Sequence, residues 1–319
     1  MTANRGYIAP TRRPGALGVH SVDHFALTVP DLAIAESFYS AFGLDVRREA
    51  DRLGLYTAGN PHRWASIIEG PRKQLHHISF GAFADDMPRF AERLRALGVD
   101  RIDAPGGFDS NGIWFRDPDG ALREIRAAEK TSLNGKGAFL PPVSTDPGVR
   151  GAAARATATH PRPLRFSHML SFVGNAATAI EFYRNTVGLK LADAAGSDIA
   201  FMHAIHGSDH HILAFGSGGG PGLHHCSWDM GGIEQIGLAA KNMADHGHRA
   251  GWGLGRHVLG SNYFHYVRDP WGSYAEYTAD IDYIPHTQDW QAGSWGDEDA
   301  LYLWGPELPA DFIVNHEAA

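Results

Sequence analysis

Two stretches of the chain share one order of hydrophobic and polar positions. Residues 22–46 (VDHFALTVPDLAIAESFYSAFGLDV) and 166–191 (FSHMLSFVGNAATAIEFYRNTVGLKL) each begin with a run of β-branched and aromatic residues, continue with apolar residues at helical spacing, and close on Gly-Leu. The first run predicts a strand, and the helical spacing predicts an amphipathic helix. A glycine just past the last turn ends such a helix without steric cost.

A second pair of stretches follows a related plan. Residues 75–100 and 223–251 both open with Leu-His-His, contain one helical segment, and close it at a glycine. Two short strands then follow, within 111–127 and 261–279, and an Asp-Pro-x-Gly turn joins them. In that turn Pro presets φ and Gly supplies a positive φ. The chain is therefore predicted to contain four modules of strands with one helix each.

The spacing between equivalent residues indicates a duplicated domain. The separations are 144 for His24 and His168 (168 − 24), 148 for His77 and His225 (225 − 77), and 152 for Glu124 and Glu276 (276 − 124). Each separation exceeds the one before it by four residues, as insertions in the loops between the strands would cause. We expect an α+β protein with a first domain over 1–127, a linker over 128–162, a second domain over 163–280, and a tail over 281–319 whose place on the core the sequence does not indicate.

The composition narrows the possible functions. Among 319 residues, 28 are basic and 36 acidic, and this formal charge of −8 leaves no basic excess to bind nucleic acid. No apolar run approaches the roughly 18 residues of a spanning helix, and the start lacks a signal peptide's apolar region, so we expect a cytoplasmic protein without a membrane partner. The single Cys226 excludes an internal disulfide and a thiolate cluster. The 19 histidines point to metal or proton chemistry.

Three side chains that commonly bind metals lie in predicted strands of the second domain, namely His168, His225 and Glu276. Two imidazoles and one carboxylate are the facial ligand set of non-haem Fe(II) oxygenases, which leaves three positions for substrate and dioxygen. The alternative is that these histidines only satisfy hydrogen bonds in the core. Tyr266 stands ten residues before Glu276, and this even separation allows both to face one side of a strand pair.

The segments SHMLSFV, DHHILAF, LHHCSWDM, GRHVLGSNYFHYVRDP and GSYAEY, which contain these residues, resemble the type I extradiol ring-cleaving dioxygenases of the vicinal oxygen chelate superfamily. The resemblance extends over nearly the whole chain, from about Val19 to Trp304. It implies two tandem vicinal-oxygen-chelate domains, each with two paired βαβββ modules that form an open, barrel-like sheet. It also implies an enzyme that cleaves a catechol-type aromatic diol next to its hydroxyl groups with O₂, and a homo-oligomer.

The same resemblance implies roles for individual residues. It makes His168, His225 and Glu276 the ligands of Fe(II), or of Mn(II) as in a few members of the family. It makes His211 the acid–base residue, and it places His257 and Tyr266 in contact with the substrate oxygens.

Two His-His pairs leave a choice of residue. Neighbouring side chains on a regular strand point to opposite faces, so we expect only one of His224 and His225 to enter the site. The family places the ligand second, which selects His225, and the same alignment selects His211 over His210. Strand parity with Glu276 also favours Phe264 over Tyr263 as an aromatic wall of the site.

The first domain carries the same three residue types, at His24, His77 and Glu124. A functional interpretation makes them a second iron site, and a structural one makes them a remnant of duplication. The positions that correspond to Tyr266, His257 and His211 hold Trp114, Pro105 and Arg63. Because these residues differ, we expect no catalysis in the first domain.

Two other functions of the same superfamily remain open. A metal-dependent isomerase or lyase of the glyoxalase type also uses paired modules, but it does not need His211, His257 and Tyr266 together. A binding module that sequesters a ligand, as bleomycin-resistance proteins do, needs no ligand set of two histidines and a glutamate.

Overall fold

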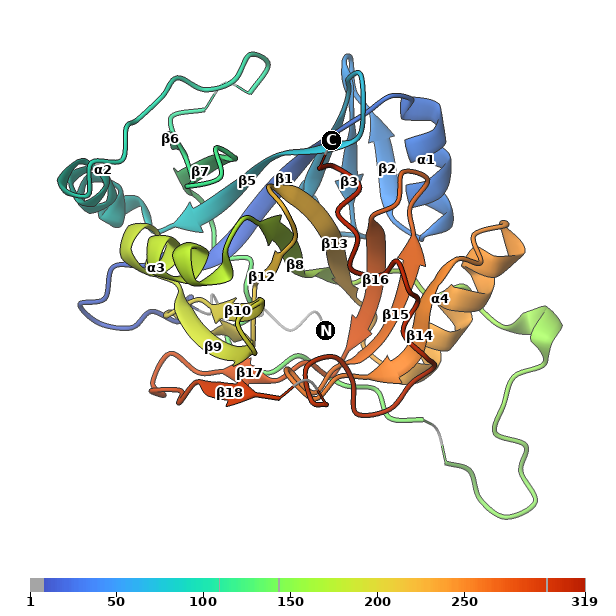
Figure 1. Ribbon diagram of the computed structural model, residues 1–319. Coiled ribbons are helices and arrows are strands. Elements are labelled where there is room, and N and C mark those ends of the chain that lie inside the picture. Colours follow the sequence, from blue (N-terminus) through green and yellow to red (C-terminus); the bar gives the residue numbers. More distant parts are fainter. Residues whose placement is uncertain (1–8, 109, 143, 297, 319) are drawn as a thin grey trace, which may run out of the picture.

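The chain forms two large sheets with helices packed against them (Figure 1). The computed structural model describes residues 9–108, 110–142, 144–296 and 298–318. Within these ranges, one sheet has seven strands and the other nine. Four α-helices lie in the same ranges, and none of them is long and apolar enough to cross a lipid bilayer.

The first sheet contains two modules joined side by side. Strands β1 and β5 pair antiparallel at the join, β1 pairs parallel with β4, and β5 pairs parallel with β7. The order is β2-β3-β4-β1-β5-β7-β6. Its elements are β1 (Ser21–Val29), α1 (Leu32–Ala41), β2 (Asp45–Arg48), β3 (Arg52–Tyr56), β4 (Ala65–Glu69), β5 (Gln74–Ala82), α2 (Met87–Ala96), β6 (Ile113–Arg116) and β7 (Leu122–Ala127).

The second sheet repeats this order and adds one strand at each edge. Its order is β14-β15-β16-β13-β8-β12-β10-β9-β18, in which β8 and β13 take the places of β1 and β5. Both sheets are open, and the predicted α+β duplication is confirmed. The elements are β8 (Arg165–Val173), α3 (Ala176–Thr186), β9 (Lys190–Ala195), β10 (Ile199–His203), β12 (Leu213–Ser217), β13 (Gly222–Asp229), α4 (Ile233–Asp245), β14 (Gly251–Arg256), β15 (Tyr263–Arg268), β16 (Tyr274–Ala279) and β18 (Gly293–Trp295), with β11 (Ser208–Asp209) and β17 (Tyr283–Ile284) forming a separate pair.

Local sequence signals explain where α1 begins and ends. Asp31 caps its start, since the carboxylate accepts hydrogen bonds from the backbone N–H groups of Ala33 and Ile34. Gly43 follows its last turn with a φ of 100°, a conformation that glycine adopts without steric cost. The corresponding glycines after the other three helices also have positive φ, as the sequence indicated; they are Gly98, Gly188 and Gly247.

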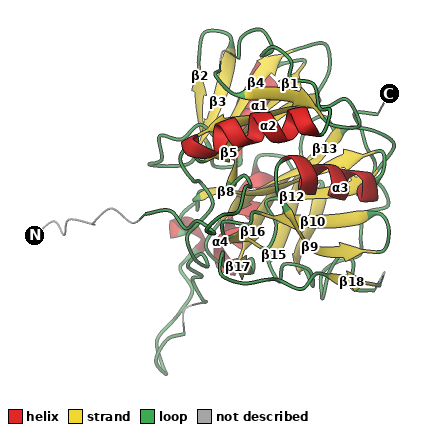
Figure 2. Ribbon diagram, turned by 90° about the vertical axis from the view of Figure 1, so that its left-hand side faces the viewer, coloured by secondary structure: helices red, strands yellow, loops and turns green. Residues whose placement is uncertain are grey.

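One continuous hydrophobic core joins the two sheets. Helices α2 and α3 lie side by side where the sheets meet (Figure 2). The ring of Phe42, just after α1, stacks on Tyr277 of β16 with centroids 3.9 Å apart, and the Tyr277 hydroxyl donates a hydrogen bond of 2.8 Å to the Phe42 carbonyl oxygen. Because neighbours on a strand face opposite sides, Glu276 points away from this junction.

The C-terminal tail, described over residues 281–296 and 298–318, packs back on the second domain and reaches the first near its end. Its strand β18 pairs with β9, and Trp304 bridges to Arg256 at the end of β14. Near the end, the buried Glu317 carboxylate contacts Lys73 Nζ and accepts hydrogen bonds from the backbone N–H groups of Leu75 (2.7 Å) and Leu223 (3.1 Å). The tail is therefore fixed to both sheets.

We expect Tyr277→Phe to lower the free energy of unfolding by about 1–3 kcal/mol, because it removes the donor to a buried carbonyl while keeping the ring stack. Urea unfolding of the metal-free protein measures this change. Tyr263→Phe is the control, since its partly exposed hydroxyl bonds to the Arg256 side chain, and it should cost less than about 0.5 kcal/mol. Equal losses in the two variants would contradict this account of the junction.

Candidate metal centre

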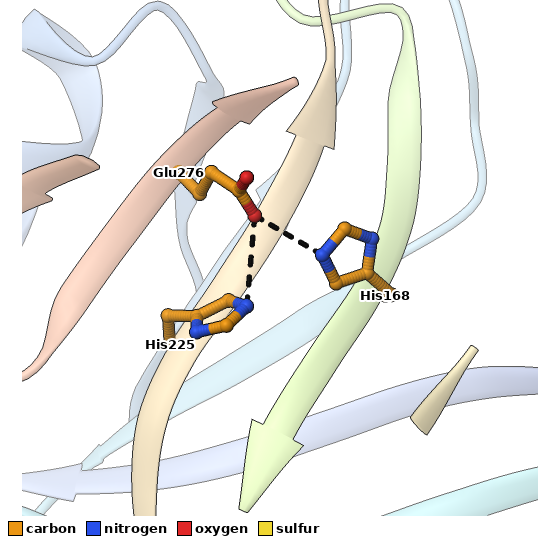
Figure 3. Close-up of side chains that lie close together, drawn as sticks. All are labelled: His168, His225 and Glu276. Atoms are coloured by element: carbon orange, nitrogen blue, oxygen red, sulfur yellow. Dashed lines mark ion pairs between the residues drawn. The ribbon is translucent and has the colours of Figure 1, made fainter. Parts of the chain in front are cut away.

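Three side chains from neighbouring strands meet on one face of the second sheet (Figure 3). His168 of β8, His225 of β13 and Glu276 of β16 offer ligand atoms within 4.8 Å of one another. Glu276 Oε2 lies 3.1 Å from His168 Nε2 and 3.5 Å from His225 Nε2. Strands β8, β13 and β16 are adjacent in the sheet, so residues distant in the chain reach one point.

Two buried atoms of this cluster have no hydrogen-bond partner in the described part of the chain. They are His225 Nε2 and Glu276 Oε2. An unsatisfied buried polar atom costs roughly 1–3 kcal/mol, more when it is charged, so such a pair requires an explanation. A cation between the three side chains would satisfy both atoms. The donor set of two imidazole nitrogens and a carboxylate suits a first-row divalent metal, and the residues therefore fit a metal ion.

The protonation states of His225 and Glu276 are those that metal ligands need. Burial lowers the pKa of the His225 imidazole well below its ordinary value, which keeps the ring neutral. Burial acts to raise the pKa of the Glu276 carboxyl, but the neighbouring His168 outweighs it and holds this pKa well below its usual range. Neutral imidazole and ionised carboxylate are the forms that bind a metal.

A β-bulge at the start of β13 changes the expected side-chain alternation. The pairing with β8 shifts between Leu223 and His225, so His224 has no partner of its own in the ladder. A bulge re-aims the side chains next to it. Both His224 and His225 consequently border the same cavity. Only His225 belongs to the ligand cluster, as expected, because His224 Nε2 is hydrogen-bonded to the Phe312 carbonyl oxygen. The sequence contains no residue pattern that distinguishes this bulge from a regular strand.

The three further residues expected at the site lie around the same cavity. His211, between β11 and β12, has its ring centroid 4.2 Å from that of His168. Tyr266 pairs with Glu276 across β15 and β16, so both side chains lie on one side of these strands. His257, just after β14, has its Nε2 atom 3.0 Å from the Tyr266 hydroxyl and 3.8 Å from Glu276 Oε1.

The cavity above the cluster has a volume of about 210 Å³. Its walls are largely apolar and come partly from β8, β10 and β14. The loop between β14 and β15 and the C-terminal tail supply most of the rest, and sequence analysis missed the tail because it has no periodic pattern. Besides Tyr266, the apolar and aromatic lining residues are Leu170, Phe172, Ile199, Phe201, Trp252, Leu259, Ala300, Leu301, Phe312 and Ile313.

Phe264, which parity favoured as a wall of the site, does not line the cavity. It is fully buried and stacks on the ring of His257, with centroids 4.1 Å apart. The expectation that Phe264 forms a wall of the site is therefore wrong, because His257 lies between Phe264 and the cavity.

Comparisons with known proteins agree with this geometry. The family model of the glyoxalase/bleomycin resistance protein/dioxygenase superfamily matches residues 21–125 and 165–277. Metapyrocatechase 2 of Cupriavidus necator is 46% identical over 311 residues, which is 97% of this chain and 96% of that protein. The chain belongs to the extradiol dioxygenases of this superfamily. The resemblance noted in the sequence is thereby confirmed.

More distant members of the superfamily share the fold. A manganese-dependent 2,3-dihydroxybiphenyl 1,2-dioxygenase of Geobacillus genomosp. 3 is 25% identical, with 89% of this chain and 93% of that protein covered. The crystal structure of a Mn(II)-bound glyoxalase from Novosphingobium aromaticivorans superposes with a TM-score of 0.75, 21% identity, and coverage of 94% of this chain and 95% of that one. The same fold thus occurs in proteins that are named for different activities.

In this extradiol dioxygenase, the first-domain triple has the same backbone positions but different contacts. The ring centroids of His24 and His77 lie 5.5 Å apart, as do those of His168 and His225. Glu124, however, accepts hydrogen bonds from Ser79 and Ser110, one at each carboxylate oxygen. Trp114 and Phe108 pack edge-on against His77. Serines and aromatic rings thus take the places that a metal and a substrate would need.

We expect the metal-free protein to lose stability steadily as the pH falls from about 6.5 towards 4. Burial lowers the pKa of five histidines to about 4, namely His20, His203, His206, His224 and His265. Because their pKa is lower in the folded than in the unfolded chain, the stability that they contribute is complete above about pH 6.5 and is lost as the pH falls towards 4. Urea unfolding at pH 7.5, 6 and 5 measures this. A constant free energy of unfolding over that range would contradict it.

Proposed function

We propose that the protein cleaves the ring of a catechol-type diol next to its hydroxyl groups with O₂, using Fe(II) held by His168, His225 and Glu276. The observation that carries this proposal is the pair of buried, unpartnered ligand atoms, His225 Nε2 and Glu276 Oε2, beneath an apolar cavity. The 46% identity to a metapyrocatechase supports the same assignment. Mn(II) suits this donor set as well, and we propose it as the second choice. A homo-oligomer and a cytoplasmic location stay predictions.

When bound, a ferrous ion with three protein ligands supplies Lewis acidity, redox chemistry and open positions for a diol and O₂. We assign acid–base chemistry to His211 at its Nε2 atom, because its Nδ1 atom is engaged with His210 Nδ1 at 3.1 Å. We assign contact with the diol oxygens to His257 and Tyr266, which are hydrogen-bonded to each other beside Glu276. The apolar walls limit the access of water to the reacting ring.

The cavity favours a small, uncharged diol. None of its lining residues in the described chain is Lys or Arg, and Asp198, exposed at the surface, is an acidic residue of the lining. A carboxylated catechol would therefore find no cationic partner in the cavity. The volume of about 210 Å³ lies below the roughly 300–1,000 Å³ common for ligand pockets, which favours one aromatic ring over two.

A glyoxalase-type isomerase is the alternative enzyme, since a Mn(II)-bound glyoxalase shares the fold. The combination of His211, His257 and Tyr266 around one cavity favours the dioxygenase, because an isomerase does not need all three. A ligand-sequestering module needs no metal-ligand set, so the unpartnered atoms of His225 and Glu276 argue against it.

We expect His225→Ala to lose bound iron and ring cleavage together, because it removes one of three ligands. His77→Ala, at the equivalent position of the first domain, should keep both. The measurement is anaerobic reconstitution with Fe(II), iron analysis, and then oxygen uptake and ring-fission absorbance after addition of catechol. Loss of turnover in folded His77→Ala, or full turnover in His225→Ala, would overturn the assignment. A reconstituted protein that takes up no oxygen with any diol would favour the isomerase or the binding module.

We also expect kcat/KM for catechol and methylcatechols to exceed that for 2,3-dihydroxybiphenyl and for carboxylated catechols by roughly tenfold or more, because of the cavity's size and lack of cations. Oxygen uptake across this panel with the Fe(II) enzyme measures the ratios. An equal or higher kcat/KM for the two-ring diol would contradict the inference from cavity size. A preference for the carboxylated ring would contradict the inference from charge.

A further inference from the structure

Two backbone carbonyl groups of the C-terminal tail contact ring nitrogens of histidines in the cavity. His224 Nε2 lies 2.8 Å from the Phe312 carbonyl oxygen, and His257 Nδ1 contacts the Leu301 carbonyl oxygen. A carbonyl oxygen has no proton and can only accept. His224 Nε2 and His257 Nδ1 must therefore carry the ring proton in these hydrogen bonds.

The position of the proton on His224 determines that on His225. In the neutral His224 ring, protonation at Nε2 leaves a lone pair at Nδ1, which lies 2.7 Å from His225 Nδ1. His225 must then carry its own proton at Nδ1 and donate it to His224. This leaves a bare lone pair at His225 Nε2, the atom that lies 3.5 Å from Glu276 Oε2 and has no hydrogen-bond partner.

The position of the proton on His257 follows directly from its contact with the tail. In the neutral His257 ring, the proton at Nδ1 is donated to the Leu301 carbonyl oxygen, so Nε2 holds a lone pair and accepts the hydrogen bond of 3.0 Å from the Tyr266 hydroxyl. The Tyr266 proton consequently points to His257 in the absence of a diol.

We propose that the tail selects the tautomers of the site histidines, directly for His257 and through His224 for His225. His224 is accordingly a positioning residue for a metal ligand. The choice of tautomers follows from these hydrogen bonds alone, whereas its role in ring cleavage rests on the proposed function. A metal ligand imidazole commonly donates its second N–H to a fixed acceptor, which sets the ring orientation and basicity. Here that acceptor is another histidine, which the tail orients.

The tail is held firmly enough to act as a fixed acceptor. Phe312 is buried and packs against His224, Tyr266 and Trp252, with centroids 4.7–5.0 Å apart. Five residues later, the buried Glu317 carboxylate binds the backbone N–H of Leu223, the residue before His224. The opposite tautomer of His225 would place two lone pairs against each other at 2.7 Å and lose a buried hydrogen bond, so the arrangement is strongly one-sided.

The first test reads the tautomers in the metal-free, full-length protein labelled with ¹⁵N-histidine. The ring signals of His225 are assigned by their loss in His225→Ala. We expect a protonated Nδ1 and a bare Nε2 at His225, and the reverse pattern, protonated at Nε2, at His224. A protonated Nε2 at His225 would overturn the proposal. The tautomers are read in the unaltered chain, so the result does not depend on whether the His224 variants fold.

The second test compares two variants that each keep one of the two contacts of His224. In His224→Gln the amide reaches the position of Nε2 and keeps the bond to Phe312, but His225 Nδ1 loses its acceptor. In His224→Asn the amide oxygen stands at the position of Nδ1 and can still accept from His225. We expect Mn(II) affinity, measured by titration of the metal-free proteins, to fall by roughly 10–100-fold in the glutamine variant and by only about threefold in the asparagine variant.

Thermal unfolding of both variants accompanies the titrations. A purely structural role for His224 predicts equal losses of Mn(II) affinity, and that result would contradict the proposal. Neither readout involves a diol or O₂. If the tautomers are as expected but the enzyme cleaves no diol, only the proposed function is overturned. If the enzyme cleaves a diol but His225 is protonated at Nε2, only the proposed selection of tautomers is overturned.

Discussion

The second domain is organised around one buried arrangement, in which the ionised carboxylate of Glu276 lies beside the imidazole nitrogens of His168 and His225. Glu276 and His225 are both buried, yet each keeps one atom without a hydrogen-bond partner among the residues that the structure describes, namely Oε2 of Glu276 and Nε2 of His225. A folded chain does not ordinarily retain such atoms without a compensating ligand. The remaining features of the domain, including the bulge, the apolar cavity and the tail, serve to hold these groups in place and to shield them from water.

The duplicated first domain differs at the carboxylate, although His77 Nε2, like His225 Nε2, has no hydrogen-bond partner among the described residues. Glu124 occupies the position of Glu276, but two serine hydroxyls satisfy its carboxylate oxygens, and aromatic rings fill the space beside His77. In the second domain, Ser227 corresponds to Ser79, yet its hydroxyl makes no hydrogen bond within the described part of the chain, and Glu276 Oε2 is left without a partner. The difference between the two domains thus lies in a few side chains around a shared strand framework.

Much of this could be predicted from the sequence. The repeat offsets predicted the duplicated α+β fold, because strands and helices of fixed length keep equivalent residues at nearly constant separations. The even spacing of Tyr266 and Glu276 predicted that they share a face.

Two features of the site could not be predicted from the sequence in this way. The bulge at His224 breaks the alternation on which strand parity depends, and the wall of the cavity comes from a tail that has no periodic pattern. The acceptors that the tail provides are backbone carbonyls of Leu301 and Phe312, and no side-chain pattern reports them.

The most direct test of the account is an anaerobic crystal structure of the Fe(II)-loaded protein, with anomalous scattering at the iron edge to locate the metal. The account predicts one iron per chain, bound by Nε2 of His168, Nε2 of His225 and the carboxylate of Glu276, with every other coordination position free of protein atoms. Iron at His24, His77 and Glu124, or a coordination shell closed by a fourth and further protein ligands, would contradict it.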